Sequence, residues 1–250
     1  MTAPQPSHRQ AFAPMDWALL TAVALMWGSS FLLIDIGLDH LEPAAVEWLR
    51  LVFGGATLAC IPAARRPLIR RAEWPLVALL GLVWMAVPFL LFAIAQQSIA
   101  SSLAGMINGA APLFTAAIAA AWSRSIPARW QLAGLVIGFA GVLLINGPAT
   151  LGAPASALGA GLILLAALFY GIAFNLAVPL EKRSGALPVI WRAQLVAIVL
   201  VAPPGVVGLA GSTPAWSSLL AMLALGALST GLGFAAFTTW LAASERRAGQ

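Results

Sequence analysis

Long apolar stretches separated by short polar connections dominate this sequence. An α-helix needs about 20 apolar residues to cross the hydrocarbon core of a bilayer. Eight stretches approach or exceed that length: residues 17–38, 44–62, 74–95, 101–122, 130–145, 158–180, 187–209 and 216–243. The connections are rich in Pro, Ser, Gly and charge, as in RRPLIRR (65–71) and EKRSG (181–185). The pattern predicts an all-α polytopic membrane protein with eight transmembrane helices and no inserted soluble domain.

The composition agrees with this class. The chain of 250 residues is 61% hydrophobic and 8% charged, whereas soluble domains carry about 25% charged residues. Its mean hydropathy is +0.94. The single cysteine, Cys60, lies in an apolar stretch and supports neither a disulfide framework nor a thiolate metal cluster. We interpret it as a packing residue.

The net charge of +5 would suggest nucleic acid as the partner of a soluble chain, but the placement of the basic residues explains it differently. Lys and Arg follow the second, fourth, sixth and eighth stretches, whereas the odd-numbered connections (LDHLE, QQSIAS, NGPATLGAPAS and AGSTPA) contain none. The positive-inside rule therefore predicts a multi-pass protein of the plasma membrane, the inner membrane of a bacterium, with both termini in the cytoplasm. The first stretch is longer than the core of a signal peptide, so we expect it to remain as a helix.

Two short segments of the sequence echo each other. LMWGSSF (25–31) and LFYGIAF (168–174) share their pattern of Leu, aromatic, Gly and Phe at a spacing of 143 residues. At nearly the same spacing, WLRLV (48–52) matches WRAQLV (191–196). Phe89 and Phe92 likewise match Phe234 and Phe237. The matches predict an internal repeat that contains five helices.

Because five is odd, the second copy must enter the membrane from the opposite side, as an inverted-topology repeat. Secondary transporters have this architecture, with the substrate site near the midplane between the repeats. We expect a first five-helix repeat over 17–146 and a second, incomplete repeat of three helices over 158–243. Residues 1–16 and 244–250 are then cytoplasmic tails.

The sequence resembles the EamA-type branch of the drug/metabolite transporter superfamily. The resemblance rests on WGSSF in the first stretch, Arg50 in the second, Pro112, Leu113 and Phe114 in the fourth, and the paired repeat. It implies ten helices in two inverted five-helix repeats and the export of amino acids, metabolites or drugs. Two departures are visible. The family's acidic turn after helix 4 is replaced by SRSIP (123–127). The last two helices of the second repeat are expected to be missing, so the chain is either a fragment of a longer protein or a naturally short form.

Polar residues inside the apolar stretches are the candidates for a substrate cavity. In the fourth stretch, small and polar residues recur at spacings of three and four and share one helix face. Such a stripe serves helix packing as readily as it serves a cavity. A proline within the membrane, however, frees a backbone carbonyl, and a buried amide needs a partner. The predicted substrate-binding residues are Trp27, Ser30, Trp84, Asn108, Pro112, Tyr170, Asn175 and Thr230.

Three charged residues lie close together in predicted depth. Asp35, Glu47 and Arg50 are near the outer ends of the first two stretches, where an unpaired charge is expensive. One interpretation is an ion pair that clamps the helices. The other makes Asp35 or Glu47 a site of proton coupling or of binding to a substrate ammonium. Arg192 is the predicted counterpart of Arg50 in the second repeat and is interpreted as structural.

The leading functional prediction is a secondary active transporter that exports a small metabolite, amino acid or drug-like compound by alternating access. A truncated or non-transporting membrane scaffold is the alternative. An intramembrane enzyme is a third possibility, but His8, His40 and Lys182 lie outside the stretches and no serine has a nearby base. We therefore predict no catalytic residue, no metal and no cofactor. The predicted partners are a small-molecule substrate, the lipid bilayer and a possible second copy in a homodimer, without nucleic acid.

Overall fold

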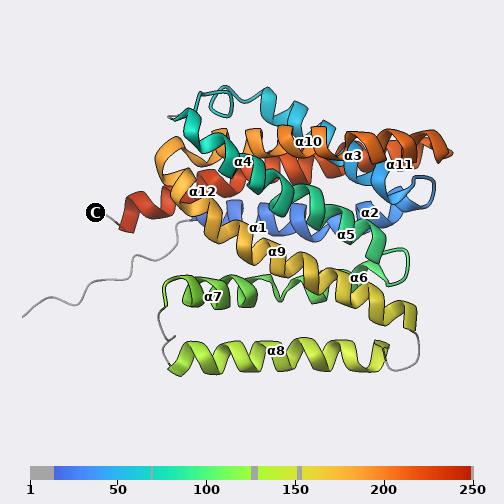
Figure 1. The fold of residues 1–250 in the computed structure, drawn as a ribbon, viewed down its shortest axis with the longest axis horizontal. Helices are drawn as coiled ribbons and strands as arrows, with labels where there is room; N and C mark the ends of the chain where they lie inside the picture. The colour runs from blue at the N-terminus through green and yellow to red at the C-terminus, as the bar shows by residue number, and fades with distance from the viewer. Residues whose placement is uncertain (1–13, 69, 125–128, 151–153, 249–250) are drawn as a thin grey trace, which may run out of the picture.

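The computed structural model describes residues 14–68, 70–124, 129–150 and 154–248. All regular structure in these residues is helical, as predicted (Figure 1). The η1 element is a 3₁₀-helix, and η2 and η3 are π-helical segments. The elements in chain order are α1 (Pro14–Gly28), α2 (Ser30–Leu38), α3 (Pro43–Ala59), η1 (Arg71–Glu73), α4 (Trp74–Leu80), η2 (Gly81–Ala86), α5 (Val87–Ala95), α6 (Ser101–Asn108), α7 (Ala111–Trp122), α8 (Arg129–Thr150), α9 (Pro154–Ser184), α10 (Ala186–Gly211), α11 (Trp216–Ala224), η3 (Leu225–Leu232) and α12 (Gly233–Ala248).

Each of the eight predicted stretches contains helix, and in the described residues six spans are long and apolar enough to cross a membrane. These are Met15–Leu38, Arg71–Ala95, Ser101–Trp122, Ala157–Ser184, Ala186–Gly211 and Trp216–Leu241. Helix α3, with 17 residues, is shorter than the roughly 20 residues that a crossing needs. The chain is thus a polytopic helical membrane protein, and the count of eight crossings stays a prediction. Most of the two predicted tails, residues 1–13 and 249–250, lies outside the described residues, but α12 continues to Ala248.

Four of the spans are interrupted, and proline explains two of the interruptions. Pro112 lacks an N–H and cannot bond to the carbonyl of Asn108, so α6 ends there and α7 begins after a short turn. Pro88 has the same effect on the carbonyl of Trp84, and the π-helical segment η2 directly precedes α5. In η3 the hydroxyl of Thr230 donates to the carbonyl of Leu225, five residues back, at 3.3 Å.

Helices α3 and α10 pack against each other near the centre of the bundle. Gln194 Nε2 donates to the carbonyl of Leu51 at 2.9 Å, and Trp191 Nε1 donates to the carbonyl of Gly55 at 3.2 Å. Two side-chain to backbone bonds thus join these helices in an environment where an unpaired polar group is expensive.

Each π-helical segment packs closely against one of these two helices at a glycine: η3 against α3, and η2 against α10. A Cβ on Gly226 of η3 would lie 2.7 Å from the carbonyl oxygen of Arg50 and 2.5 Å from Phe53 Cβ. A Cβ on Gly81 of η2 would lie 2.5 Å from the carbonyl oxygen of Ala193 and 3.0 Å from Val196 Cβ. Glycine permits this backbone approach, which is how helices pack closely in lipid.

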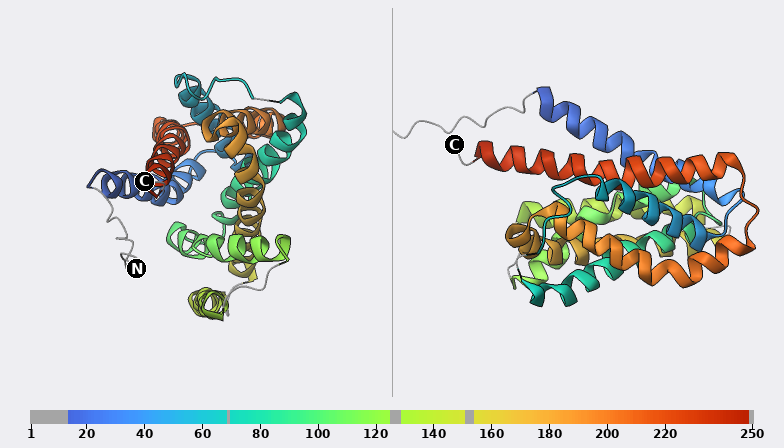
Figure 2. Two further views of the ribbon diagram at one scale, coloured as in Figure 1. Left: turned by 90° about the vertical axis from the view of Figure 1, so that its left-hand side faces the viewer. Right: turned by 90° about the horizontal axis from the view of Figure 1, so that it is seen from above.

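The remaining helices surround this centre. Helix α1 packs against α12, and α9 joins the central helices to α7 (Figure 2). Helix α8 lies at the edge of the bundle, beside α7 (Figures 1 and 2). A single residue, Gly185, connects α9 to α10 with a φ of +83°, a conformation that favours glycine.

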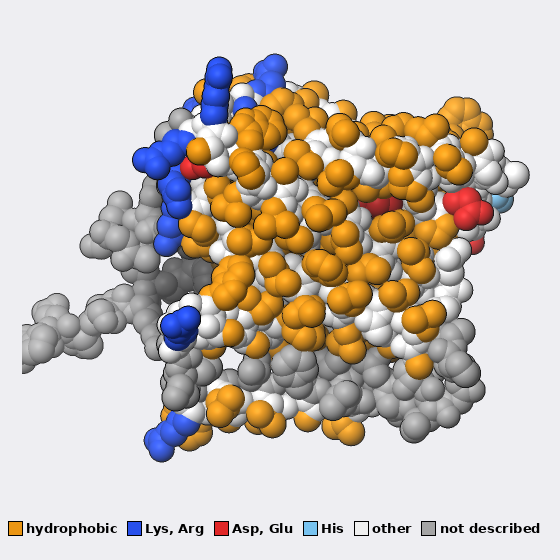
Figure 3. Space-filling model, viewed as in Figure 1, with side chains coloured by type: hydrophobic (Ala, Val, Ile, Leu, Met, Phe, Trp, Pro, Cys, Tyr) orange, Lys and Arg blue, Asp and Glu red, His pale blue; other side chains and the backbone are white. Residues whose placement is uncertain are grey.

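The surface divides into an apolar middle and two polar ends. Hydrophobic side chains cover most of the visible face, Lys and Arg gather at one end, and His and most of the visible acidic side chains lie toward the other (Figure 3). Large apolar side chains such as Val199 and Val207 of α10 are exposed. An exposed apolar belt of this kind suits contact with lipid rather than with water.

Candidate substrate cavity

The interrupted spans converge on one cavity with a volume of about 660 Å³. It is lined by Trp27, Ser30, Phe31, Ile34, Arg50, Trp84, Phe89, Phe92, Asn108, Gly109, Ala111, Pro112, Thr115, Ala116, Ala119, Tyr170, Phe174, Ser229, Thr230 and Phe234. Seven of the eight predicted substrate-binding residues are in this lining, and the eighth, Asn175, is not. The size is within the range of small-molecule sites, which are also mostly apolar with a few placed polar groups.

Asn175 of α9 faces helix α7 instead. Its Nδ2 donates to the carbonyl of Thr115 at 3.0 Å and to that of Gly171, one turn back in α9, at 2.8 Å. The side-chain amide thereby holds α9 against the helix that carries Thr115. Its position in the structure is that of a packing residue behind the cavity wall.

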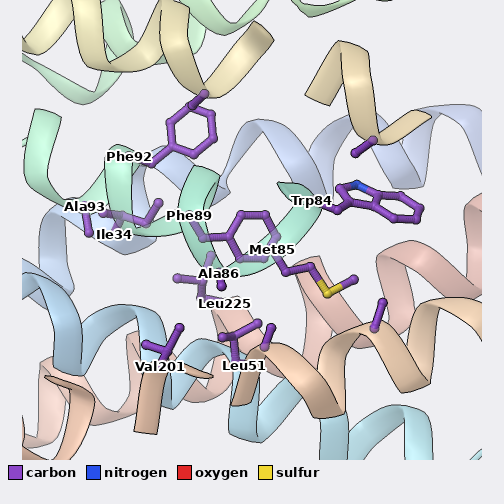
Figure 4. Packing of buried hydrophobic residues seen from close by; sticks show 14 of the residues in the cluster. Ile34, Leu51, Trp84, Met85, Ala86, Phe89, Phe92, Ala93, Val201 and Leu225 are labelled. Carbon is purple, nitrogen blue, oxygen red and sulfur yellow. The ribbon is translucent and has the colours of Figure 1, made fainter. Parts of the chain in front are cut away.

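Aromatic rings form a continuous part of the wall. Trp84 contacts Phe174 and Phe234 edge to face, with ring centroids 5.6 and 5.5 Å apart. Tyr170 contacts Phe92 at 5.8 Å and stacks on Phe174 at 5.9 Å. Trp84, Phe89 and Phe92 all come from η2 and α5, next to the core residues Met85 and Ala86 (Figure 4). The contacts make a firm surface suited to an apolar or aromatic substrate body.

Hydroxyl groups stabilise the part of the cavity wall where α1 ends. The carbonyl of Met26 accepts hydrogen bonds from the hydroxyls of Ser29, Ser30 and Ser229, at 3.1, 3.2 and 2.6 Å. Trp27 Nε1 donates in return to the carbonyl of Ser229 at 3.1 Å. Serine hydroxyls that bond back to a carbonyl three or four residues earlier bend helices. The motif WGSSF therefore builds the junction of α1, α2 and η3.

Arg50 is the one charged side chain in the described lining. It is 7% exposed. Its Nε donates to Thr230 Oγ1 at 3.0 Å, and its guanidinium carbon lies 3.6 Å from the centroid of the Phe89 ring. The side chain thus spans from α3 to both η3 and α5.

The predicted ion pair of Arg50 with Asp35 or Glu47 does not form in the structure. Within the described residues, the ion pair found at 4.0 Å or less joins Arg183 to Glu73, at the basic end of the molecule. Asp35 is exposed, and Glu47, one turn before Arg50, is 1% exposed with an Oε1 that lacks a hydrogen-bond partner. Arg50 is directed toward Thr230 and Phe89 instead. A coupling role for Asp35 or Glu47 stays a prediction.

Arg192 is not the counterpart of Arg50 in packing. Its Nη1 donates to the carbonyls of Pro188 and Ala64, at 3.1 and 3.4 Å. The carbonyl that meets Gly81, as the Arg50 carbonyl meets Gly226, belongs to Ala193.

Several lining residues were not among the predicted site residues. Phe31 and Phe174 belong to the two echoing segments, and Phe89, Phe92 and Phe234 belong to the other matches between the repeats. The repeated aromatic positions were therefore a usable signal. Thr115 belongs to the stripe of small and polar residues on the fourth stretch, whereas Ser229 carried neither signal. In the described part of the chain, no cluster of three or more His, Cys, Asp or Glu side chains could hold a metal ion.

Comparison with known families decides the classification. The model of the EamA-like transporter family matches residues 16–147, which is more than half of the chain. The chain belongs to the EamA-like transporter family. This confirms the resemblance inferred from WGSSF, Arg50 and the Pro-Leu-Phe segment.

Relatives of this EamA-like chain carry names that refer to transport. An uncharacterized transporter of Archaeoglobus fulgidus is 27% identical over 53% of this chain and 48% of its own length. The uncharacterized inner membrane transporter YedA of Escherichia coli K12 is 27% identical over 51% of this chain and 42% of its own length. A probable terminal-alkyne amino-acid exporter of Streptantibioticus cattleyicolor is 27% identical over 87% of this chain and 73% of its own length. The chain thus spans about half or less of the first two relatives.

One solved structure has the same fold. A crystal structure superposes with a TM-score of 0.64 at 19% identity, covering 91% of this chain and 79% of the other. At this identity the likeness concerns the fold alone. It agrees with an all-helical bundle for the EamA-like chain.

Proposed function

We propose that this EamA-like protein is a secondary active transporter that exports a small metabolite, amino acid or drug-like compound by alternating access. The observation that carries the proposal is the cavity itself, which lies where four interrupted spans meet. In secondary transporters, substrate sites form at interrupted helices between two repeats. The aromatic lining and the few polar groups suit a small amphipathic compound.

Matching contacts in the two halves support an inverted repeat. Trp27 packs on Phe234 and Phe237, with centroids 6.0 and 5.3 Å apart. Tyr170, its counterpart at a spacing of 143 residues, packs on Phe89 and Phe92, at 6.4 and 5.8 Å. Trp27 and Tyr170 therefore each contact a pair of phenylalanines from the other half of the chain. These two pairs of phenylalanines were themselves matched in the sequence.

The glycine crossings support the same relation. Gly226 meets Arg50 and Phe53, and Gly81 meets Ala193 and Val196. The contacted residues are again 143 apart, and the two glycines are 145 apart, each in a π-helical segment. An inverted repeat of this kind provides two bundles that can rock against each other around a fixed site.

The orientation of the chain in the membrane and its substrate range are supported by the charge distribution and by the names of relatives. Basic residues after even-numbered helices favour cytoplasmic termini, and the basic end of the surface is the end at which α12 terminates (Figures 1 and 3). A further relative, a probable amino-acid metabolite efflux pump of Salmonella typhimurium, is 30% identical over 52% of this chain and 42% of its own length. Its name and that of the alkyne amino-acid exporter favour substrates of amino-acid size for this chain too.

Efflux measurements with cavity variants test the proposal. Cells that express the protein are loaded with amino acids by feeding dipeptides, and export into the medium is followed over time. We expect Trp27→Ala and Asn108→Ala to abolish export at unchanged expression, because both residues line the cavity. Trp216→Ala is the matched control, since Trp216 is 81% exposed and outside the lining. Normal export by both cavity variants would refute the assignment of the cavity.

A further inference from the structure

Arg50 is the one charged side chain among the described residues that line the cavity. The other lining residues in the described chain are apolar, aromatic, amide or hydroxyl side chains. No carboxylate of the described residues lies within 4.0 Å of the guanidinium. The buried carboxyl of Glu47, one turn earlier on α3, interacts with Arg50 electrostatically from beyond that distance. A charged side chain buried among apolar helices is costly, and such residues mark functional sites.

The guanidinium retains most of its hydrogen-bonding capacity. Arginine has five N–H donors, and in the described structure only the Nε donor of Arg50 has a protein acceptor, Thr230 Oγ1. The two terminal nitrogens make no hydrogen bond to the described residues, yet neither is a fully buried, unpartnered atom. Since Arg50 lines the cavity, these nitrogens face its space.

The contacts on either side hold the guanidinium in one orientation. The Phe89 ring covers one face at 3.6 Å, and Thr230 fixes the Nε edge at 3.0 Å. A planar fork that is held in advance loses little conformational entropy on binding, and its geometry matches a carboxylate through two parallel bonds. The rings of Phe92, Tyr170 and Phe174 line the same cavity and contact one another.

We propose that the cavity selects small monocarboxylates with an apolar or aromatic body, and that the terminal nitrogens of Arg50 bind the carboxylate. The body lies against the aromatic wall. The inference rests on the proposed function, because it assigns a substrate class to the same cavity. It also predicts discrimination: a neutral amide or a cation of equal size offers no carboxylate to the terminal N–H donors of Arg50.

The test compares three probes of nearly equal size on the purified chain in lipid nanodiscs. The probes are 3-phenylpropionate, 3-phenylpropanamide and phenethylammonium, and binding is measured by calorimetry and by the fluorescence of the cavity tryptophans. We expect 3-phenylpropionate to bind at least about tenfold more tightly than the amide, as charge-assisted hydrogen bonds to a buried group imply. The ammonium probe should bind least.

Arginine variants assign the preference to Arg50. Arg50→Met should remove the preference for the carboxylate, whereas Arg192→Met, which changes an arginine outside the cavity, should retain it. If Arg50→Met fails to fold, Thr230→Val and Thr230→Ser replace it. The valine variant, which lacks the hydroxyl on Nε, should weaken carboxylate binding several-fold, and the serine variant should not.

The outcomes separate this inference from the proposed function. Equal binding of the propionate and the amide, with both lost in Trp27→Ala, would overturn the carboxylate assignment and leave the cavity as the substrate site. Carboxylate binding that persists unchanged in Arg50→Met would also overturn it. If cavity variants affect neither binding nor export, the proposed function itself fails.

Discussion

The two echoing segments place their glycines in opposite surroundings. At Gly171 of LFYGIAF, an added Cβ would lie 2.9 Å from the carbonyl carbon of Phe114 and 3.0 Å from Ile118 Cδ1. At Gly28 of LMWGSSF, a Cβ would meet no described atom within 4 Å. The same pattern thus forms a tight helix contact in one half and an open face in the other. Similarity of sequence predicts similar local structure, but packing depends on which helix lies alongside.

The aromatic residues before these glycines also differ. Trp27 donates from Nε1 to the carbonyl of Ser229 at 3.1 Å and so joins α1 to η3. The hydroxyl of Tyr170 has no hydrogen-bond partner in the described residues and borders the cavity. Trp27 is therefore part of a structural junction as well as of the cavity wall, whereas the hydroxyl of Tyr170 remains available to a ligand in the cavity.

The glycine pair should give the largest difference in stability. Gly171→Ala should destabilise the protein by about 1–3 kcal/mol, because the methyl group would press on the backbone of α7. Gly28→Ala should be neutral or stabilise by up to about 1 kcal/mol, because alanine favours helix more than glycine does. Unfolding in mixed micelles, followed by circular dichroism, measures both. Equal losses in the two variants would contradict the difference in packing.

The aromatic pair, Trp27 and Tyr170, should give a smaller difference in stability than the glycine pair. The Tyr170 variant should lower export while leaving stability nearly unchanged. Trp27→Phe keeps a ring but loses the bond to Ser229, so it should cost about 0.5–1.5 kcal/mol. Tyr170→Phe should change stability by less than about 0.5 kcal/mol and still lower export several-fold, since only a cavity hydroxyl is removed. A Tyr170→Phe variant that exports normally would show that the hydroxyl does not contact the substrate.

The serine junction should give the smallest effect. Three hydroxyls share the carbonyl of Met26, so Ser30→Ala alone should cost less than about 0.5 kcal/mol. Ser229→Ala should cost more, because its bond of 2.6 Å is the shortest and joins two spans. The double variant, measured in the same unfolding assay, should lose more than the sum of the two single variants. Strict additivity would mean that the hydroxyls act independently.

The sequence predicted much of the site because membrane helices reveal their polar residues clearly. Trp27, Ser30, Asn108 and Tyr170 were found as polar or aromatic residues within apolar stretches, and all four line the cavity. Asn175 met the same criterion but lies behind the wall, because its amide satisfies two backbone carbonyls. A one-residue difference in helix position changes direction by about 100°, so spacing alone could not separate these cases.

The charged residues were the harder case. Depth along the helices placed Asp35, Glu47 and Arg50 at one level, and the cost of a buried charge favoured an ion pair. Depth does not specify the direction in which a side chain extends. The structure directs Arg50 to Thr230 and Phe89, which come from helices far away in the sequence.

The sequence by itself determined the class of this protein, its apolar segments and its repeated aromatic and glycine positions, because hydrophobicity and periodicity are local properties of the chain. Only the tertiary structure decided which repeated glycine is packed, which amide faces the cavity and what Arg50 contacts. These depend on contacts between separate helices, such as Asn175 with Thr115, 60 residues away, and Arg50 with Thr230, 180 residues away. Close packing of α3 against η3 at Gly226 brings those two side chains together.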